Sequence, residues 1–296
     1  MIVRDKPGPF DLLLAVRGSV LPQIAPRIAL FAALAAGMVW VDGHLMVLPR
    51  ADGTAFTVFG IALSLFLGFR NNAAYDRWWE GRRLWGGLLA DMRALAREVE
   101  VFVPDVAVRC GMLRDALAFL HWHRAQLRGL RGDAQAMARG AGFAQAAHPP
   151  DAVLDALNAR LAAAHRAGMV DGFGARALSA RLGGMALAQA GCERIAATPL
   201  PYVYSLLIYR TSTLYCLLLP LALVGNAGWL TPLFVAIVAY VFLGLAEVTE
   251  ELSHPFGATL NALPLDAICR AAEISLAPHL GEEPPEPLNP VNFHLG

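Results

Sequence analysis

Few side chains in this sequence are spaced for catalysis. His121 and His123 offer two imidazoles, but alternate residues of a helix point in different directions, so we read them as ordinary helix surface rather than metal ligands. Ser253 and His254 precede a proline with no identifiable carboxylate partner, which indicates a turn. The sequence contains no Gly-x-Ser-x-Gly, phosphate-loop or His-Glu-x-x-His pattern. We therefore expect no enzyme, no metal site and no cofactor.

Three acids, Glu247, Glu250 and Glu251, close the last apolar stretch of the chain. They can line a path for ions, or they can be solvated carboxylates at a membrane boundary. The second interpretation is the simpler one, because charged residues commonly mark the end of a membrane span.

A stripe of large apolar residues suggests another kind of chemistry, the exclusion of water. Ile61, Leu65 and Phe69 recur at i, i+4 and i+8 among small residues. Ordinary packing explains this spacing if the large residues face one neighbour and the small ones let another approach. Several copies around an axis would instead form stacked apolar rings about 12 Å long, which can hold back ions by dewetting. Spacing alone leaves both readings open.

The elements that carry this stripe are typical of a membrane protein. Hydrophobic residues make up 56% of the chain and charged residues 16%, against about 25% charged residues in soluble domains. Four uncharged stretches stand out: Ile28–Val41, Ala55–Phe69, Thr211–Val224 and Trp229–Ala246. Three have only 14 or 15 residues, well below the roughly 20 that a lone span needs, so we expect their helices to extend into water or to be shielded by neighbouring subunits.

Basic residues predict how these stretches are oriented. They gather before the first stretch, after the second and before the third: Arg4, Lys6, Arg17, Arg27, Arg70, Arg77, Arg82, Arg83, Arg194 and Arg210. The two loops inside the hairpins hold only Arg50 among basic residues. Cytoplasmic loops carry the excess of Lys and Arg in membrane proteins. We therefore expect four spans in two hairpins that cross the inner membrane of the cell, with both termini in the cytoplasm.

The remaining chain reads as cytoplasmic helices. Leu84, Leu88, Met92, Leu95 and Val99 recur at helical spacing, which predicts that the second span continues as one long helix. Further helices are expected over Val106–Leu130, over Asp151–Ala167 with Asp151 as N-cap, and over Gly174–Ile195, with Arg131–Ala147 as a connection. No strand pattern appears, and the fold class is an all-α membrane protein.

The expected organisation has four parts. They are an N-terminal segment with the first hairpin (1–75), a cytoplasmic helical region (76–198), a second hairpin (199–250) and a cytoplasmic C-terminal segment with a Pro-rich tail (251–296). The prolines of the tail predict a segment that is extended or wraps over a neighbour.

Three motifs carry a resemblance to a known family. They are "GFRNNAAYDRWWEGRRLWG" from Gly68, "QAGCERIAATPLPYVYSLLIYRTSTLYCLLLP" from Gln189 and "EELSHPFGATLNALPLD" from Glu250. Together they make the chain resemble the bestrophins, in particular the bacterial branch. The resemblance implies a homopentamer with four spans per subunit and an axial pore that conducts ions passively. The narrow apolar neck of that family corresponds to Ile61, Leu65 and Phe69.

The resemblance also implies roles for the residues around the neck. Arg77, Trp78 and Glu80 would support the neck structurally rather than bind ions. Asn71 and Asn72, just below it, can face permeating ions because an amide offers both a donor and an acceptor.

Two further features of the family bear on this chain. A cytoplasmic aperture would lie within Ala177–Leu182, with Leu178 as the best candidate. Calcium-opened eukaryotic members carry acids where this chain has Thr259 and Ala262. A hard cation needs several oxygen ligands, and Asp266 alone is a poor remnant, so we expect no tight calcium site.

The leading interpretation is a channel for small monovalent ions whose partners are membrane lipid and further copies of the chain. A net charge of zero gives no general attraction to nucleic acid. A membrane scaffold or regulatory subunit that keeps the fold but conducts little is the alternative. A secondary transporter is disfavoured because no internal repeat or matched pair of broken spans is found. An apolar neck sets no ion sign, so the sequence predicts conduction without predicting selectivity.

Overall fold

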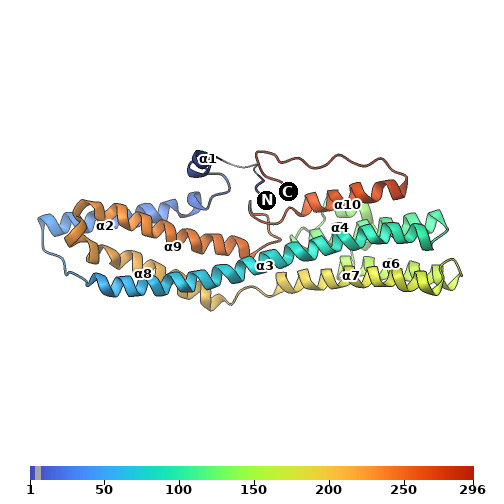
Figure 1. The fold of residues 1–296 in the computed structure, drawn as a ribbon, viewed down its shortest axis with the longest axis horizontal. Coiled ribbons are helices and arrows are strands. Elements are labelled where there is room, and N and C mark those ends of the chain that lie inside the picture. The colour runs from blue at the N-terminus through green and yellow to red at the C-terminus, as the bar shows by residue number, and fades with distance from the viewer. Residues whose placement is uncertain (4–7) are drawn as a thin grey trace. The chain divides into compact units, whose positions relative to one another are not determined.

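The computed structural model describes residues 1–3 and 8–296 and is built from α-helices (Figure 1). No sheet occurs among these residues, where the only β-type pairings are isolated bridges from His294 to Ile2 and to Val291. The predicted all-α class is therefore confirmed. Arg4 and Lys6, counted above among the orienting basic residues, lie outside the described residues.

The chain divides into two compact units. The hairpin unit comprises residues 8–78 and Pro199–His254, and the tail unit comprises residues 1–3, Trp79–Thr198 and Pro255–Gly296. One helix, α3 (Gly53–Phe102), contributes residues to both. With 50 residues it is about 75 Å long at 1.5 Å per residue, and it includes the long continuation that the leucine spacing predicts.

The hairpin unit is a bundle of four long helices. They are α2 (Leu21–His44), residues 53–78 of α3, α8 (Tyr202–Ala227) and α9 (Thr231–Ser253), with the short α1 (Pro9–Leu13) before them. Helix α9 packs against both α2 and α8. Their shared core takes residues from all four helices, among them Ile24, Leu67, Tyr215 and Val235.

Three stretches of the described chain are long and apolar enough to cross a membrane: Leu21–His44, Gly53–Phe102 and Tyr202–Ser253. The third contains both α8 and α9, which are separated by the 3-10 turn η2 (Gly228–Leu230). Gly228 has φ +49°, a conformation that a residue with a side chain adopts only with strain. This glycine therefore allows the chain to reverse between two apolar helices.

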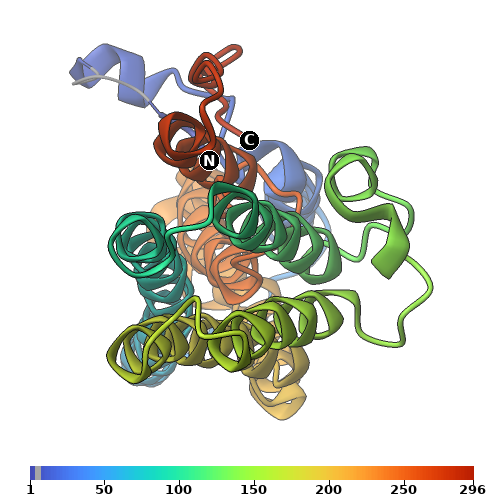
Figure 2. The ribbon, with the colours of Figure 1, turned by 90° about the vertical axis from the view of Figure 1, so that its right-hand side faces the viewer.

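The tail unit combines the second part of α3 with further helices. They are α4 (Val106–Leu127), α5 (Ala134–Gly140), η1 (Ala141–Phe143), α6 (Pro149–Arg166), α7 (Gly172–Ala197) and α10 (Leu265–Leu280). Figure 2 shows several of these helices nearly end-on. Leu88, Met92, Leu95 and Val99 are fully buried, as expected for the core face of an amphipathic helix.

Two local expectations are wrong. Helix α6 begins at Pro149, and its N-cap is His148 rather than Asp151. Proline is well accepted in the first turn, where its missing N–H leaves no bond unmade. The stretch Arg131–Ala147 is not a plain connection, because it contains α5, whose first turn is capped by the Asp133 carboxylate through a 2.9 Å hydrogen bond from Ala136 N.

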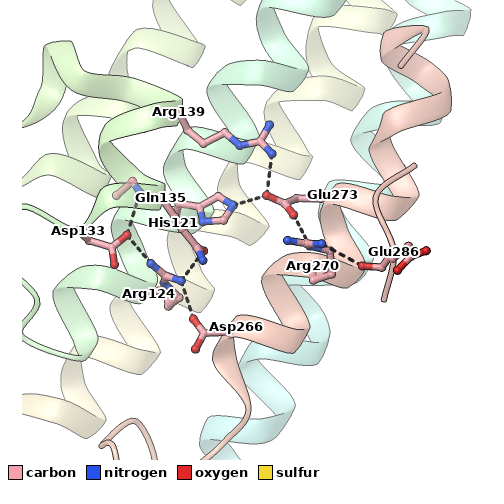
Figure 3. A network of polar contacts seen from close by, with 10 residues as sticks. His121, Arg124, Asp133, Gln135, Arg139, Asp266, Arg270, Glu273 and Glu286 are labelled. Atoms are coloured by element: carbon pink, nitrogen blue, oxygen red, sulfur yellow. Dashed lines mark hydrogen bonds and ion pairs between the residues drawn. The ribbon is translucent and has the colours of Figure 1, made fainter. Parts of the chain in front are cut away.

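A network of charged side chains ties α10 to α4 and α5 (Figure 3). Glu273 on α10 accepts hydrogen bonds from His121 at 3.0 Å and Arg139 at 2.7 Å, and it pairs with Arg270 at 2.8 Å. Burial alone would raise the pKa of Glu273. The hydrogen bond and charge of His121, with the charges of Arg139 and Arg270, outweigh it and lower that pKa to about 2.

A second part of the network is centred on Arg124, which is almost fully buried. Its guanidinium donates to Gln135 at 2.6 Å, to Asp266 at 2.5 Å and to Asp133. The Pro-rich tail is extended and returns along α10, where Arg270 donates to the Glu286 carbonyl at 2.9 Å. The two ends of the chain also meet, since the Met1 amino group lies 2.5 Å from the Leu295 carbonyl.

The low pKa of Glu273 predicts an acid-dependent stability. Its folded-state pKa of about 2 lies below the ordinary glutamate pKa of 4.5, so its contribution to stability is complete above about pH 4.5 and is lost as the pH falls through about 2. We expect Glu273→Gln to lower the free energy of unfolding at neutral pH by roughly 1–3 kcal/mol and to flatten its fall in that acid window. Thermal unfolding of the detergent-purified protein followed by circular dichroism measures both.

The matched control is Glu282→Gln, just past the end of α10. Glu282 pairs with Arg114 at 3.3 Å, and about half of its side chain is exposed, so its loss should change stability by less than about 1 kcal/mol. Equal effects of the two substitutions would contradict the role given to Glu273.

Candidate functional site

The apolar stripe lies on the outward face of α3 in the hairpin unit. Ile61 is 59% exposed, Leu65 58% and Phe69 69%. Two residues on the opposite face, Leu63 and Leu67, are buried at 3% and 0% and belong to the core shared with α2, α8 and α9. The large side chains of the stripe are therefore not needed to pack this subunit.

Polar residues share the face of the stripe. At about 100° per residue, Thr57, Ser64 and Asn72 lie within roughly a quarter turn of Ile61, and all three are exposed. The hydroxyls of Thr57 and Ser64 donate to backbone carbonyls one turn earlier, at 3.0 and 2.8 Å. The face is thus apolar in its middle, with its hydroxyls satisfied internally, and carries an exposed amide beyond Phe69.

Arg70 fixes how this helix is turned. It follows Phe69 directly and is 8% exposed, and one terminal nitrogen donates to Ser205 of α8 at 2.7 Å and to Glu250 of α9 at 2.8 Å. From the sequence, Arg70 is recognisable only as one of the orienting charges. Its pairing with Glu250 could have been suspected, because each residue lies near the end of an apolar stretch. However, 180 residues separate the two in the chain.

Gly60 shows a second close approach to the core. A Cβ on this residue would lie 2.8 Å from the Tyr215 hydroxyl, which itself donates to the Phe56 carbonyl at 3.3 Å. The small residue therefore lets the tyrosine of α8 reach the backbone of α3. This contact and the Arg70 contacts hold α3 at two levels, above and below Leu65.

The residues predicted to support the neck are distributed between the two units. Arg77 donates from Nε to the Ser253 carbonyl at 2.7 Å, which ties α3 to the end of α9 within the hairpin unit. Glu80 belongs to the tail unit and pairs with Arg194 of α7 at 2.6 Å, instead of with an arginine of its own helix. Trp78 is half-buried. Arg77 therefore has a direct structural role beside the stripe.

The two predicted polar residues below the stripe differ in exposure. Asn72 is exposed, whereas Asn71 is half-buried and its side-chain oxygen accepts from Thr249 of α9 at 3.5 Å. Of the pair, Asn72 is the one on the same face as Ile61.

The predicted aperture residue, Leu178, lies on α7 and is fully buried. Its side chain packs inside the tail unit, so it does not offer a surface to a passing ion. Within the same segment Ser179 and Ala180 are exposed.

The two histidines read as helix surface are buried, which corrects that expectation. His121 is 2% exposed and bonds to Glu273, while His123 is 0% exposed and stacks against Trp85 and Phe119 at 5.5 and 5.7 Å between ring centroids. Burial lowers the pKa of His123 to about 3, with a smaller contribution from His148. His121 faces Glu273 of α10 and His123 faces Trp85 of α3, so neither imidazole lies on the surface.

Ser253 is the last residue of α9 and His254 is its C-cap, so the turn expected here begins only at Pro255. A carboxylate also lies nearby, contrary to expectation. The His254 Nδ1 lies 4.0 Å from the Glu250 carboxylate and 3.1 Å from the Glu250 carbonyl oxygen. Because Glu250 also pairs with Arg70 and Glu251 accepts from Gln23 at 3.2 Å, two of the three glutamates at this end are held by neighbours.

The position that resembles a calcium ligand is neutralised by arginines. The two carboxylate oxygens of Asp266 accept from Arg124 and Arg128, each at 2.5 Å. Thr259 is exposed and Ala262 is buried, and no group of three or more His, Cys, Asp or Glu side chains that could hold a metal occurs among the described residues. Both carboxylate oxygens of Asp266 are therefore already engaged by arginines.

An exposed apolar stripe, held by a buried arginine on a bundle with three membrane-compatible stretches, defines a helical membrane protein. The sequence model of the bacterial and fungal bestrophin protein family matches residues 1–278 of the chain. The chain belongs to this bestrophin family, which confirms the resemblance carried by the three sequence motifs.

Similar proteins of known description are consistent with this family. A voltage-dependent anion channel-forming protein of Mesorhizobium japonicum is 45% identical over 303 residues, covering 100% of this chain and 97% of that one. A protein of the same description from Escherichia coli K12 is 36% identical and covers 93% of each chain. The crystal structure of a bacterial bestrophin homologue from Klebsiella pneumoniae has a TM-score of 0.82 at 30% identity, covering 88% of this chain and all of the other.

The arginine contacts of Asp266 predict that calcium does not act on this protein. Micromolar calcium should change neither the midpoint of thermal unfolding nor the ion flux of the reconstituted protein. Asp266→Asn should lower the unfolding midpoint by several degrees, because Arg124 and Arg128 lose a charged partner. Like the unaltered protein, this variant should show no change of flux on addition of calcium. A steep rise of flux with calcium would contradict this assignment and require other ligands.

Proposed function

We propose that this protein is an anion channel of the bacterial inner membrane, with an ion path lined by Ile61, Leu65 and Phe69. The observation that carries the proposal is the contrast between this exposed stripe and the buried Leu63 and Leu67 on the same helix. Membership of the bestrophin family and the names of the relatives, which describe voltage-dependent anion channel-forming proteins, support conduction of anions.

The proposed assembly is a homopentamer with four spans per subunit. One copy of the stripe cannot enclose a passage, so several copies must surround an axis, and the family resemblance gives five. Helices α2, α3, α8 and α9 would be the spans, and the gathering of basic residues at one end of each hairpin favours cytoplasmic termini. Native mass measurement of the purified protein should give five copies of the 31.7 kDa chain.

The proposed neck would work by excluding water. Five copies of each of the three apolar side chains would form a stack of three rings about 12 Å long. An ion that enters this stack loses hydration without gaining polar contacts. Arg70 and Arg77 would keep the stripe turned toward the axis by holding the opposite side of α3. Asn72, directly beyond the neck, would offer the ion polar contacts in place of the lost water, because its amide both accepts and donates hydrogen bonds.

The alternative is a scaffold or regulatory subunit with the same fold and little conduction. Single-channel recording of the purified protein in a planar bilayer separates the two. Unit conductance with a reversal potential that follows the chloride gradient supports the anion channel. A reversal potential that follows the cation gradient would retain the channel and overturn its anion selectivity, and a silent bilayer with intact pentamers would favour the scaffold.

Shortening the stripe tests the neck. We expect the double substitution Leu65→Ala and Phe69→Ala to raise ion flux or open probability several-fold while the assembly stays intact. The truncation widens the passage and makes it easier to wet, and these exposed side chains contribute little to packing within the subunit. Flux from reconstituted vesicles and the mass of the assembly are measured on the same preparation.

The matched control is Leu63→Ala with Leu67→Ala on the buried face. Each removes a core side chain, at a cost of roughly 2–5 kcal/mol, so this protein should express poorly or unfold at lower temperature. If the Leu65/Phe69 variant kept its pentamer and its flux were unchanged, α3 would not line the ion path.

A further inference from the structure

A cleft in the hairpin unit is separate from the stripe. It has a volume of about 330 Å³ and lies between the beginnings of α2 and α8 and the end of α9. Arg27, Arg70, Glu247 and Glu250 provide its charges, and Leu206 and Leu243 are among its apolar lining residues. We propose that this cleft binds the zwitterionic headgroup of a phospholipid that carries a phosphate and a primary ammonium, as phosphatidylethanolamine does.

The pairing of the four charges points to a zwitterion. Arg70 and Glu250 satisfy each other at 2.8 Å. Arg27 stacks on the Tyr209 ring, with 5.6 Å between its guanidinium carbon and the ring centroid, and has no acidic partner among the described residues; Glu247 has no basic partner there either. An anion would satisfy Arg27 and be repelled by Glu247, and a simple cation would do the reverse. A ligand with both charges satisfies the two residues together.

Buried polar atoms at the cleft indicate where the phosphate lies. The Arg70 side chain is 6% exposed and its Nε has no hydrogen-bond acceptor among the described residues, and the hydroxyl of Ser212, which is 1% exposed, likewise has no partner there. Buried donors without acceptors are costly. Phosphate oxygens supply several strong acceptors, and arginine is well suited to bind them.

The surroundings favour a lipid over a free metabolite. The cleft is partly open and belongs to a bundle whose stretches can cross a membrane by length and composition. Its apolar lining can contact the glycerol and the first carbons of the acyl chains. Basic pockets between membrane helices near the cytoplasmic surface are suited to phospholipid headgroups. A free ethanolamine phosphate would use the same charges without the apolar contacts.

The test is lipid binding by the detergent-purified, delipidated full-length assembly, followed by native mass spectrometry. Dioleoyl phosphatidylethanolamine should bind in preference to the phosphatidylglycerol and phosphatidylcholine of the same chains, because only the first offers an N–H-donating ammonium to Glu247. Arg27→Gln should weaken its binding roughly tenfold or more. Glu247→Gln should abolish the preference over phosphatidylglycerol while leaving phosphatidylglycerol binding equal or stronger.

The matched control is Arg210→Gln, on α8 but outside the cleft, which should bind as the unaltered protein does. Competition by soluble ethanolamine phosphate would show that the headgroup suffices, whereas lipid binding without such competition would show that the acyl chains are also needed. Binding without headgroup preference, or unaffected by both cleft substitutions, would overturn the proposal. An unaltered assembly that retains no lipid would also overturn it, and would indicate that a neighbouring subunit fills the cleft.

The lipid proposal does not rest on conduction. Lipid binding is read by mass and ion flux by a separate measurement on vesicles, so each proposal can fail while the other stands.

Discussion

The orientation of α3 in the hairpin unit depends on one buried guanidinium. Arg70 lies about half a turn around the helix from Ile61, and its bonds to Ser205 and Glu250 draw that side of α3 onto α8 and α9. Leu63 and Leu67 lie on the same inner side and fill the core. With this side fixed inward, Ile61, Leu65 and Phe69 can only face away from their own subunit. Removing a buried charge's partner is costly, so the orientation is not easily changed by rotating the helix.

This constraint separates two tasks along one helix. The inner side of α3 holds the subunit together through the arginine and the leucines. The outer side carries large apolar residues whose exposure would be unfavourable in water, and which therefore require lipid or another copy of the chain. The polar residues on the same side favour an aqueous axis over lipid, since Asn72 is exposed immediately beyond Phe69. The proposed channel neck and a stable subunit are in this way compatible, because the residues proposed to line the passage are not those that maintain the fold.

Much of the fold could be read from the sequence because it follows from local patterns. The spacing from Leu88 to Val99 identifies the core face of α3, and the uncharged stretches locate the four long helices of the hairpin unit. Features that depend on distant contacts were missed. Arg70 and Glu250 meet only when α3 and α9 pack together, and the same holds for His121 and Glu273, which are 152 residues apart. Helix α5 was missed because its seven residues lack an apolar period and rely on the Asp133 cap. Leu178, the aperture candidate, is buried inside the tail unit. The residue type alone does not tell an exposed leucine from a buried one.

The most direct test of the central claim is chemical access to Leu65 from water. Leu65 and Phe66 are almost equally exposed in the subunit, at 58% and 52%, but point about 100° apart on the helix. Cysteine would be placed at each position with half-buried Cys110 changed to serine, since the other three cysteines are buried. A charged, membrane-impermeant thiol reagent should then alter the current of the Leu65→Cys protein and leave that of the Phe66→Cys protein unchanged. No effect at Leu65, or an equal effect at both positions, would contradict an ion path along this face of α3.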